Sequence, residues 1–170
     1  MKGGKMEFLE VIKKRRSTRK FKDKSLKEEE IEKILRAANL APSAHNWQSY
    51  KIYLVKDQKI KNELVLASFG QEFIAQAPVV LVFVSYPRNS GRAEFYALQD
   101  ATIACYQAWL AAVDLGLAAV WIGAFEPSKV AEILQIGKNQ FPVAILPIGY
   151  AGEIPSKTSR KSLSDLVIRK

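Results

Sequence analysis

The chain has 170 residues, 48% hydrophobic and 25% charged, and 26 Lys and Arg against 17 Asp and Glu give a formal net charge of +9 at pH 7. This composition excludes a disordered chain and fits one domain, residues 1–170, with a substantial core. One cysteine and one histidine exclude an intrachain disulfide and a Cys/His metal site. The uncharged run at residues 101–113 is shorter than the ~20 residues of a membrane span, and no apolar segment of signal-peptide length precedes Lys13. We therefore expect a cytoplasmic protein with no metal and no membrane partner.

Helices and strands are predicted to interleave along the chain. Apolar residues at helical spacing predict helices over residues 6–16, 26–41, 58–68, 71–76, 97–115 and 128–134. Alternating or continuously apolar runs predict strands over residues 51–55, 79–85, 117–122 and 143–148. Ser25 followed by Glu28 is a capping-box pattern at the start of the second helix. This order predicts a three-layer α/β or α+β domain with helices on a mixed sheet.

The predicted helix 97–115 is apolar almost all round. A helix without a polar face is buried in a large core or against a partner. Because a domain of 170 residues has limited room to surround one helix, we expect an obligate dimer with a two-fold interface through it. We interpret Cys105, within this helix, as a packing residue rather than a nucleophile.

Basic residues gather at the two ends of the chain. Residues 1–27 hold eleven Lys and Arg against three acids and residues 156–170 hold five against one, whereas residues 28–155 hold ten against thirteen. The segment RRSTRKF, residues 15–21, places three guanidiniums and two hydroxyls within five residues. A guanidinium matches phosphate oxygens bidentately. We therefore expect a phosphorylated ligand where the two ends meet, with two solvated tails as the alternative.

A nucleic-acid surface is a further alternative for so basic a chain. Aromatic residues are interleaved with the basic ones only at Phe8 and Phe21, however, and no nucleic-acid module is present. The sequence also has no G-x-G-x-x-G and no phosphate-cradling lysine loop, which excludes Rossmann and P-loop sites. The sequence shows no pair of carboxylates of the kind that would indicate a hydrolase.

Two loops carry candidate ligand contacts. Residues 41–48 (APSAHNWQ) hold enough side-chain donors and acceptors to bind the edge of a planar heterocycle, although composition alone favours a capped turn. His45, in this loop, has no Cys, Ser or Asp partner at catalytic spacing, so we interpret it as a loop residue rather than a general base. In residues 121–125 (WIGAF), Gly123 permits close approach of the backbone to a ligand, with a plain strand-end turn as the alternative.

These motifs, in this order, resemble the nitroreductase family of FMN-dependent oxidoreductases in its short form. The matching segments are residues 15–21 (RRSTRKF), residues 41–48 (APSAHNWQ), Asp100, residues 115–117 (LGL), residues 121–125 (WIGAF), residues 147–150 (PIGY) and Arg160. The resemblance implies an α+β three-layer sandwich, a central mixed or antiparallel sheet flanked by helices, and an intertwined homodimer with FMN at the subunit interface. It implies ping-pong reduction of nitroaromatics, quinones or similar electrophiles by NADH or NADPH, with no catalytic side chain because the flavin carries the chemistry.

The resemblance also implies roles for individual residues. Arg15, Ser17 and Arg160 would bind the phosphate and ribityl chain of FMN. Arg19 would lie near N1 and O2 of the flavin, where a cation stabilises the charge of the reduced form. Loop residues of the other subunit would meet the ring, and backbone amides near Gly123 would face N5. The complete implied set is Arg15, Arg16, Ser17, Arg19, Pro42, Ser43, Ala44, Asn46, Gln48, Ile122, Gly123, Ala124 and Arg160.

The sequence departs from the family pattern at Gln48-Ser49-Tyr50, where many members have Gln-Pro-Trp, which bears on ring packing and substrate preference. Other flavin chemistry on the same fold, dehalogenation or flavin fragmentation, is the alternative enzyme function. A non-catalytic flavin-binding or nucleic-acid-binding protein is the alternative of another class.

Overall fold

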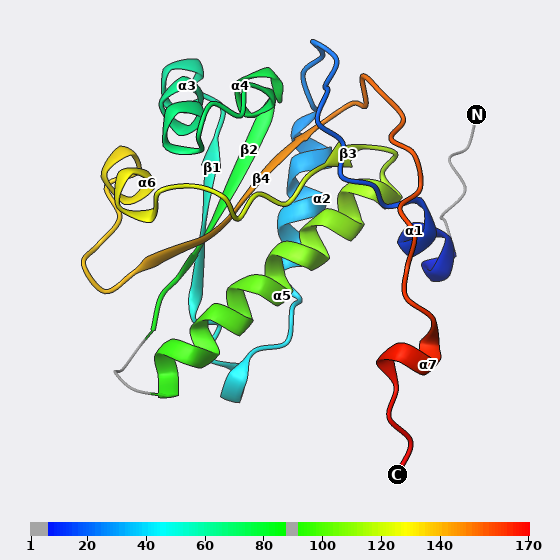
Figure 1. The fold of residues 1–170 in the computed structure, drawn as a ribbon. Helices are drawn as coiled ribbons and strands as arrows, with labels where there is room; N and C mark the ends of the chain where they lie inside the picture. Colours follow the sequence, from blue (N-terminus) through cyan, green and yellow to red (C-terminus); the bar gives the residue numbers. More distant parts are fainter. Residues whose placement is uncertain (1–6, 88–91) are drawn as a thin grey trace.

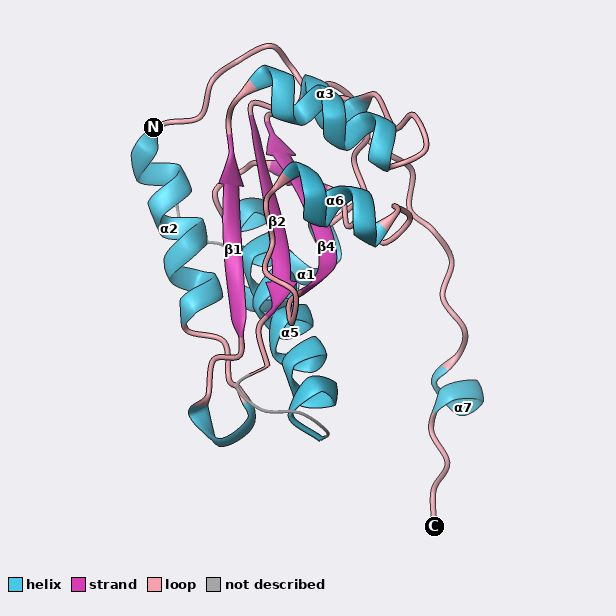
Figure 2. Ribbon diagram, turned by 90° about the vertical axis from the view of Figure 1, so that its left-hand side faces the viewer, coloured by secondary structure: helices cyan, strands magenta, loops and turns pink. Residues whose placement is uncertain are grey.

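The computed structural model describes residues 7–87 and 92–170, which form a layer of helices, a sheet and a second layer of helices (Figures 1 and 2). The strands, in their order across the sheet, are β1 (Tyr50–Val55), β2 (Val79–Ser85), β4 (Phe141–Gly149) and β3 (Ala118–Ala119). Every pairing between neighbouring strands is antiparallel. The helices of one layer are α2 (Glu28–Asn39) and α5 (Arg92–Asp114), with α1 (Phe8–Lys14) packed against α5. The helices of the other layer are α3 (Gln58–Ala67), α4 (Phe73–Gln76) and α6 (Pro127–Ile133).

The period of two along the strands assigns each residue to one layer. All seven residues of β2 are buried, as a strand covered on both faces must be. Leu81 and Phe83 pack with α2 and α5, whereas Val80 and Val82 pack with α3, α4 and α6. The three-layer α+β sandwich predicted from the sequence is therefore confirmed.

Two local predictions were wrong. Helix α2 begins at Glu28 rather than at residue 26, and its first turn is closed by the carboxylate of Glu30, which accepts a hydrogen bond of 2.8 Å from Lys27 N, instead of by Ser25. The predicted strand 117–122 is reduced to Ala118–Ala119 and an isolated bridge between Ile122 and Ile145. Its apolar run reflects burial between the two layers, because an apolar pattern alone reports burial and not strand pairing.

Helix α5 places small and large apolar residues on different faces. Ala104, Ala108 and Ala112 are fully buried toward the sheet and α2, which lets the backbones approach closely. Large side chains on the other face remain exposed: Phe95, Leu98, Ile103 and Tyr106. Only part of the apolar surface of this helix is therefore covered by its own chain. Cys105 lies on the buried face, where burial raises the pKa of its thiol well above the ordinary value. This placement agrees with its interpretation as a packing residue.

The segment after β4 runs away from the three layers. Figures 1 and 2 show it extended, with the short helix α7 (Leu163–Leu166) standing apart from the other helices. Every residue from Ser156 to Lys170 is exposed, including Leu163 and Ile168. Within the described residues, no helix has the length and apolarity needed to cross a bilayer.

Candidate functional site

The structure brings the two basic ends of the chain to one cavity of about 520 Å³. Its lining comes from α1, from the segment that follows it, and from the segment that follows β4. The lining residues are Ile12, Lys13, Arg15, Arg16, Ser17, Arg19, Pro155, Ser156, Lys157, Thr158 and Arg160. Five of the thirteen residues in the implied cofactor set therefore lie around one hollow: Arg15, Arg16, Ser17, Arg19 and Arg160.

Backbone pairing explains why these distant segments meet. Thr18 N donates to the carbonyl of Ala119 in β3 at 3.1 Å, so the segment after α1 extends the sheet beyond its β3 edge. Further along, Gly152 N donates to Lys20 O at 2.8 Å, which ties the segment after β4 to the same stretch of chain. A Cβ on Gly152 would lie 3.1 Å from Lys20 O, so a glycine suits this close approach.

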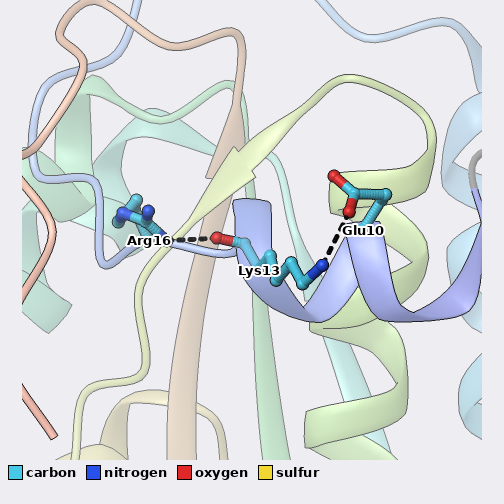
Figure 3. A network of polar contacts seen from close by, with 3 residues as sticks. All are labelled: Glu10, Lys13 and Arg16. Atoms are coloured by element: carbon cyan, nitrogen blue, oxygen red, sulfur yellow. Dashed lines mark hydrogen bonds and ion pairs between the residues drawn. The ribbon is translucent and has the colours of Figure 1, made fainter.

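Arg15 and Arg16 are held in different ways. The guanidinium of Arg15 lies over the ring of Trp109, 4.5 Å from its centroid. Arg16 folds back on α1 and donates to the carbonyls of Lys13 and Arg15 at 2.7 and 2.8 Å, while Lys13 Nζ donates to Glu10 at 3.0 Å (Figure 3). Arg16 therefore satisfies carbonyls at the C-terminal end of this helix.

Arg19 and Arg160 are the two exposed arginines of the cavity lining. Arg19 is exposed, and its backbone N donates to Glu153 Oε1 at 2.9 Å. Among the described residues, Arg160 donates only to its own neighbours, to Thr158 Oγ1 at 2.6 Å, Thr158 O at 3.3 Å and Ser159 O at 2.8 Å. Within residues 7–87 and 92–170, no carboxylate lies within 4.0 Å of any of the four arginines that line the cavity. Four uncompensated guanidiniums around one hollow favour an anionic ligand rich in oxygen.

The loop at residues 42–48 is built around Asp100. This carboxylate is 2% exposed and accepts hydrogen bonds from Ala44 N at 3.0 Å and Ser49 N at 3.4 Å. Burial of the Tyr50 hydroxyl raises its pKa, and the charge of Asp100 adds to this. Ser43 Oγ accepts from Gln48 N at 3.0 Å and closes the loop.

The backbone of this loop is strained. Non-glycine residues rarely adopt positive φ, yet His45, Asn46 and Gln48 have φ of 50°, 55° and 50°. The imidazole of His45 is exposed and lies 4.7 Å from the Trp47 ring, centroid to centroid. Hydrogen bonds to Asp100 and Ser43 hold the loop in a conformation that the free chain would seldom adopt.

The structure does not bring this loop to the basic cavity within one chain. None of Pro42, Ser43, Ala44, Asn46 and Gln48 lines the cavity. The loop contacts α5 at Asp100, in the N-terminal half of that helix, whereas the cavity adjoins α5 through Trp109, nearer its C-terminal end.

The segment 121–125 leaves the sheet beside β3. Ile122 exchanges two backbone hydrogen bonds with Ile145, at 2.9 and 3.0 Å, and Gln71 Nε2 donates to the carbonyl of Ala124 at 2.9 Å. Gly123 and Ala124 are exposed, and within the described part of the chain neither backbone N donates to a protein acceptor. Both backbone amides are therefore available to a ligand.

Sequence reasoning missed three features of the site. It did not assign Lys157 and Thr158 to the cavity, it gave no partner to Arg15, and it gave no role to Asp100 beyond the motif. The sequence did hold a signal for Asp100, because a carboxylate among the apolar residues of a buried helix needs hydrogen-bond donors around it.

Comparison with known proteins agrees with this geometry. The sequence model of the nitroreductase family matches residues 12–71 and 65–150. A putative NADH dehydrogenase/NAD(P)H nitroreductase of Methanothermobacter thermautotrophicus is 32% identical over 158 residues, which cover 91% of this chain and 82% of that protein. An FMN reductase [NAD(P)H] of Bacillus subtilis is 30% identical over 173 residues, covering 91% of this chain and 70% of the relative.

A solved structure gives the same answer for the fold. The nitroreductase family protein of Clostridium novyi NT superimposes with a TM-score of 0.81 at 35% identity, covering 90% of this chain and 89% of that one. With a family match across most of its length and a shared three-layer fold, the chain belongs to the nitroreductase family.

Proposed function

We propose that this protein is an NAD(P)H-dependent FMN oxidoreductase that reduces nitroaromatics, quinones or similar electrophiles. The observation that carries the proposal is the cavity where both basic chain ends meet, with four arginines that have no carboxylate partner among the described residues. The relatives named as FMN reductase and NAD(P)H nitroreductase support it. We also propose a cytoplasmic location, in keeping with a chain that has one buried thiol and no disulfide.

The residues around the cavity fit the phosphate and ribityl ends of FMN. A phosphate needs charged donors, which Arg15 and Arg160 offer, and a polyol chain needs hydroxyl partners such as Ser17. When bound, FMN supplies the redox chemistry between NAD(P)H and the electrophile. The chain's own task is then to bind the phosphate, to fix the ring and to hold the cation of Arg19 beside it.

The remaining members of the set belong to this proposal through a second subunit. The loop at 42–48 and the basic cavity lie toward opposite ends of α5. Two α5 helices packed antiparallel about a two-fold axis would bring the loop of one subunit to the cavity of the other. Pro42, Ser43, Ala44, Asn46 and Gln48 would then contact the flavin ring across the interface.

The apolar surface left open on the chain supports such a dimer. Ile103 and Tyr106 on α5 and Phe8 and Leu9 on α1 are exposed large apolar residues on neighbouring helices. Contiguous exposed apolar surface marks an interaction site in a globular protein. The extended segment after β4, with exposed Leu163, has the form of an arm that embraces a partner.

Ile122, Gly123 and Ala124 complete the proposed site. The free amides of Gly123 and Ala124 would donate toward N5 of the ring, and the bridge of Ile122 to β4 fixes their direction. This role asks nothing of the side chains, in keeping with an exposed Gly-Ala turn.

The test is flavin content and turnover. The purified protein should release FMN on heating and oxidise NADH or NADPH anaerobically with reduction of the bound flavin. Arg15→Ala or Arg160→Ala should weaken FMN binding about ten- to a hundredfold, since each loses charge-assisted hydrogen bonds of roughly 1.5–3 kcal/mol. Arg36→Ala is the matched control, because Arg36 is exposed on α2 and pairs with Glu32. Equal FMN affinity in all three variants would exclude the basic cavity as the phosphate site.

A further inference from the structure

A second cavity, of about 440 Å³, lies between the segment after Phe21 and the helices α3 and α4. It shares no lining residue with the basic cavity described above. Three lysines line it, Lys24, Lys56 and Lys61, against one acid, Asp23. Nothing in the proposed reductase site uses these residues.

Lys61 is the unusual member of this lining. Its side chain belongs to α3 and is 5% exposed, although lysine is almost never fully buried without a charged partner. Its Nζ donates to Ala77 O at 2.9 Å and approaches Ala75 O at 3.4 Å. An ammonium has three donors, so two carbonyls leave one N–H without a protein acceptor.

No counter-ion neutralises this charge within the described residues. No carboxylate lies within 4.0 Å of Lys61 Nζ, and the carboxylate of Asp57, one turn earlier, accepts a hydrogen bond from Ile60 N at 2.9 Å. Burial lowers the pKa of Lys61, and the charge of Asp57 opposes this only in part. An ammonium held out of water without an ion partner is costly unless something completes its surroundings.

The other two lysines that line this cavity each have a partner. Lys24 Nζ lies 3.9 Å from the centroid of the Tyr150 ring, and Lys56 pairs with Glu28. Ser25 and Gln76 add a hydroxyl and an amide to the lining. The cavity thus combines a buried cation without an ion partner, a lysine over an aromatic ring, a lysine paired with Glu28, and neutral hydrogen-bonding groups.

We propose that this second cavity binds a small oxyanion, a carboxylate or phosphate group, with Lys61 as its buried counter-ion and Lys24 and Lys56 beside it. The bound anion would take the N–H of Lys61 that the two carbonyls leave free. A lysine that serves only to cap the carbonyls at the C-terminal end of α4 would bind those carbonyls equally well and show no saturable affinity for an anion.

The test is an amide chemical-shift titration of the FMN-saturated protein with sodium phosphate, and separately with sodium acetate, at constant ionic strength. Saturable shifts at Ser25, Lys61 and Gln76 with either probe support the proposal, and the two arms separate phosphate from carboxylate preference. Residue-resolved shifts separate this cavity from the basic one, so the result stands even if the protein binds no FMN.

Lys61→Met keeps the apolar stem and removes the charge, and should weaken binding of the anion at least about tenfold. Lys59→Met, on the exposed side of the same helix, is the control and should leave the affinity unchanged. If Lys61→Met fails to fold, the double variant Lys24→Met/Lys56→Met carries the test and should also weaken binding. Absence of saturable shifts around the cavity, shifts confined to the arginine-lined cavity, or unchanged affinity in the foldable variants would overturn the proposal.

Discussion

The guanidinium of Arg15 lies on the face of the Trp109 indole, 4.5 Å from the ring centroid. Trp109, on α5, is only 6% exposed and belongs to the core, whereas Arg15 is half-buried and lines the basic cavity. Stacking occupies the flat face of a guanidinium and leaves its N–H edges free for a ligand. The buried Trp109 ring therefore holds the Arg15 guanidinium in place where the proposed phosphate would bind it.

Loss of the ring face at Trp109 should weaken FMN binding. Trp109→Leu should cost about 0.5–1 kcal/mol of binding through the lost cation–π contact, a two- to fivefold change in the dissociation constant, whereas Trp109→Phe should retain most of the affinity. Fluorescence titration of apoprotein with FMN measures both. A double-mutant cycle with Arg15→Ala separates this contact from general loosening of the core. Additive effects in that cycle would show that the stack does not serve the ligand.

The buried carboxylate of Asp100 should be essential to the loop at 42–48. In Asp100→Asn one accepting oxygen becomes an NH₂ donor that faces a backbone N–H, Ala44 N or Ser49 N. We expect a loss of about 1–3 kcal/mol in the free energy of unfolding. Urea denaturation compares this variant with Glu94→Gln, an exposed change on the same helix that should be neutral. Equal stability of the two variants would contradict the anchoring role.

The dimer is best tested at the outer face of α5. Ala108 is 0% exposed within one chain, so a charge there would disrupt the core whether or not a dimer exists. Tyr106 is 41% exposed on the uncovered face, where a charge harms only an interface. Tyr106→Glu should therefore yield folded monomer with weakened flavin binding, as read by light scattering and flavin content. Leu66→Glu, an equally radical change on exposed α3, should leave the oligomer intact. A wild-type chain that is monomeric with full flavin content would refute the proposal.

Sequence patterns predicted the elements whose signal is local. The apolar run of β2 and the periodicity of α5 come from burial of the segment itself, so both elements were found, although α5 begins five residues earlier than predicted. Strand 117–122 was overestimated because its apolar residues are buried by two helix layers rather than by pairing. The prediction of a Ser25 cap was wrong because Glu30, rather than Glu28, closes the first turn by accepting a hydrogen bond from Lys27 N.

The residues of the site likewise divide into those that sequence patterns predicted and those that depend on distant partners. The charge distribution indicated one anion site if the two basic ends met, and the family resemblance singled out residues 15–19 and Arg160, which line the same cavity. Trp109 and Asp100 act through partners more than fifty residues away, and one sequence carries no record of such pairings. The positive φ of His45 and Asn46 was not predicted either, although both residue types are enriched among the few non-glycine residues that adopt it.

Arg19 offers a test of how the chain tunes a bound flavin. It lines the basic cavity, and Glu153 anchors its backbone while its guanidinium bonds to nothing within the described residues. A cation favours the charged form of a neighbouring group, so a guanidinium beside the flavin should stabilise its reduced state. Arg19→Gln keeps donors and removes the charge, and should lower the two-electron potential; for this couple ~30 mV corresponds to ~1.4 kcal/mol.

Spectroelectrochemical titration, paired with the affinity for oxidised FMN, separates three outcomes for Arg19→Gln. A lowered potential with nearly unchanged oxidised-state affinity is the expected result. If Arg19 were instead a further phosphate ligand, both redox states would bind more weakly by the same factor and the potential would stay constant. If its side chain were merely solvated, neither quantity would move. Lys20→Gln, an adjacent exposed residue outside the cavity lining, is the control for a general change in surface charge and should leave the potential where it is. An unchanged potential in Arg19→Gln would end the case for charge stabilisation by this residue, and it would leave the phosphate role of Arg15 and Arg160 untouched.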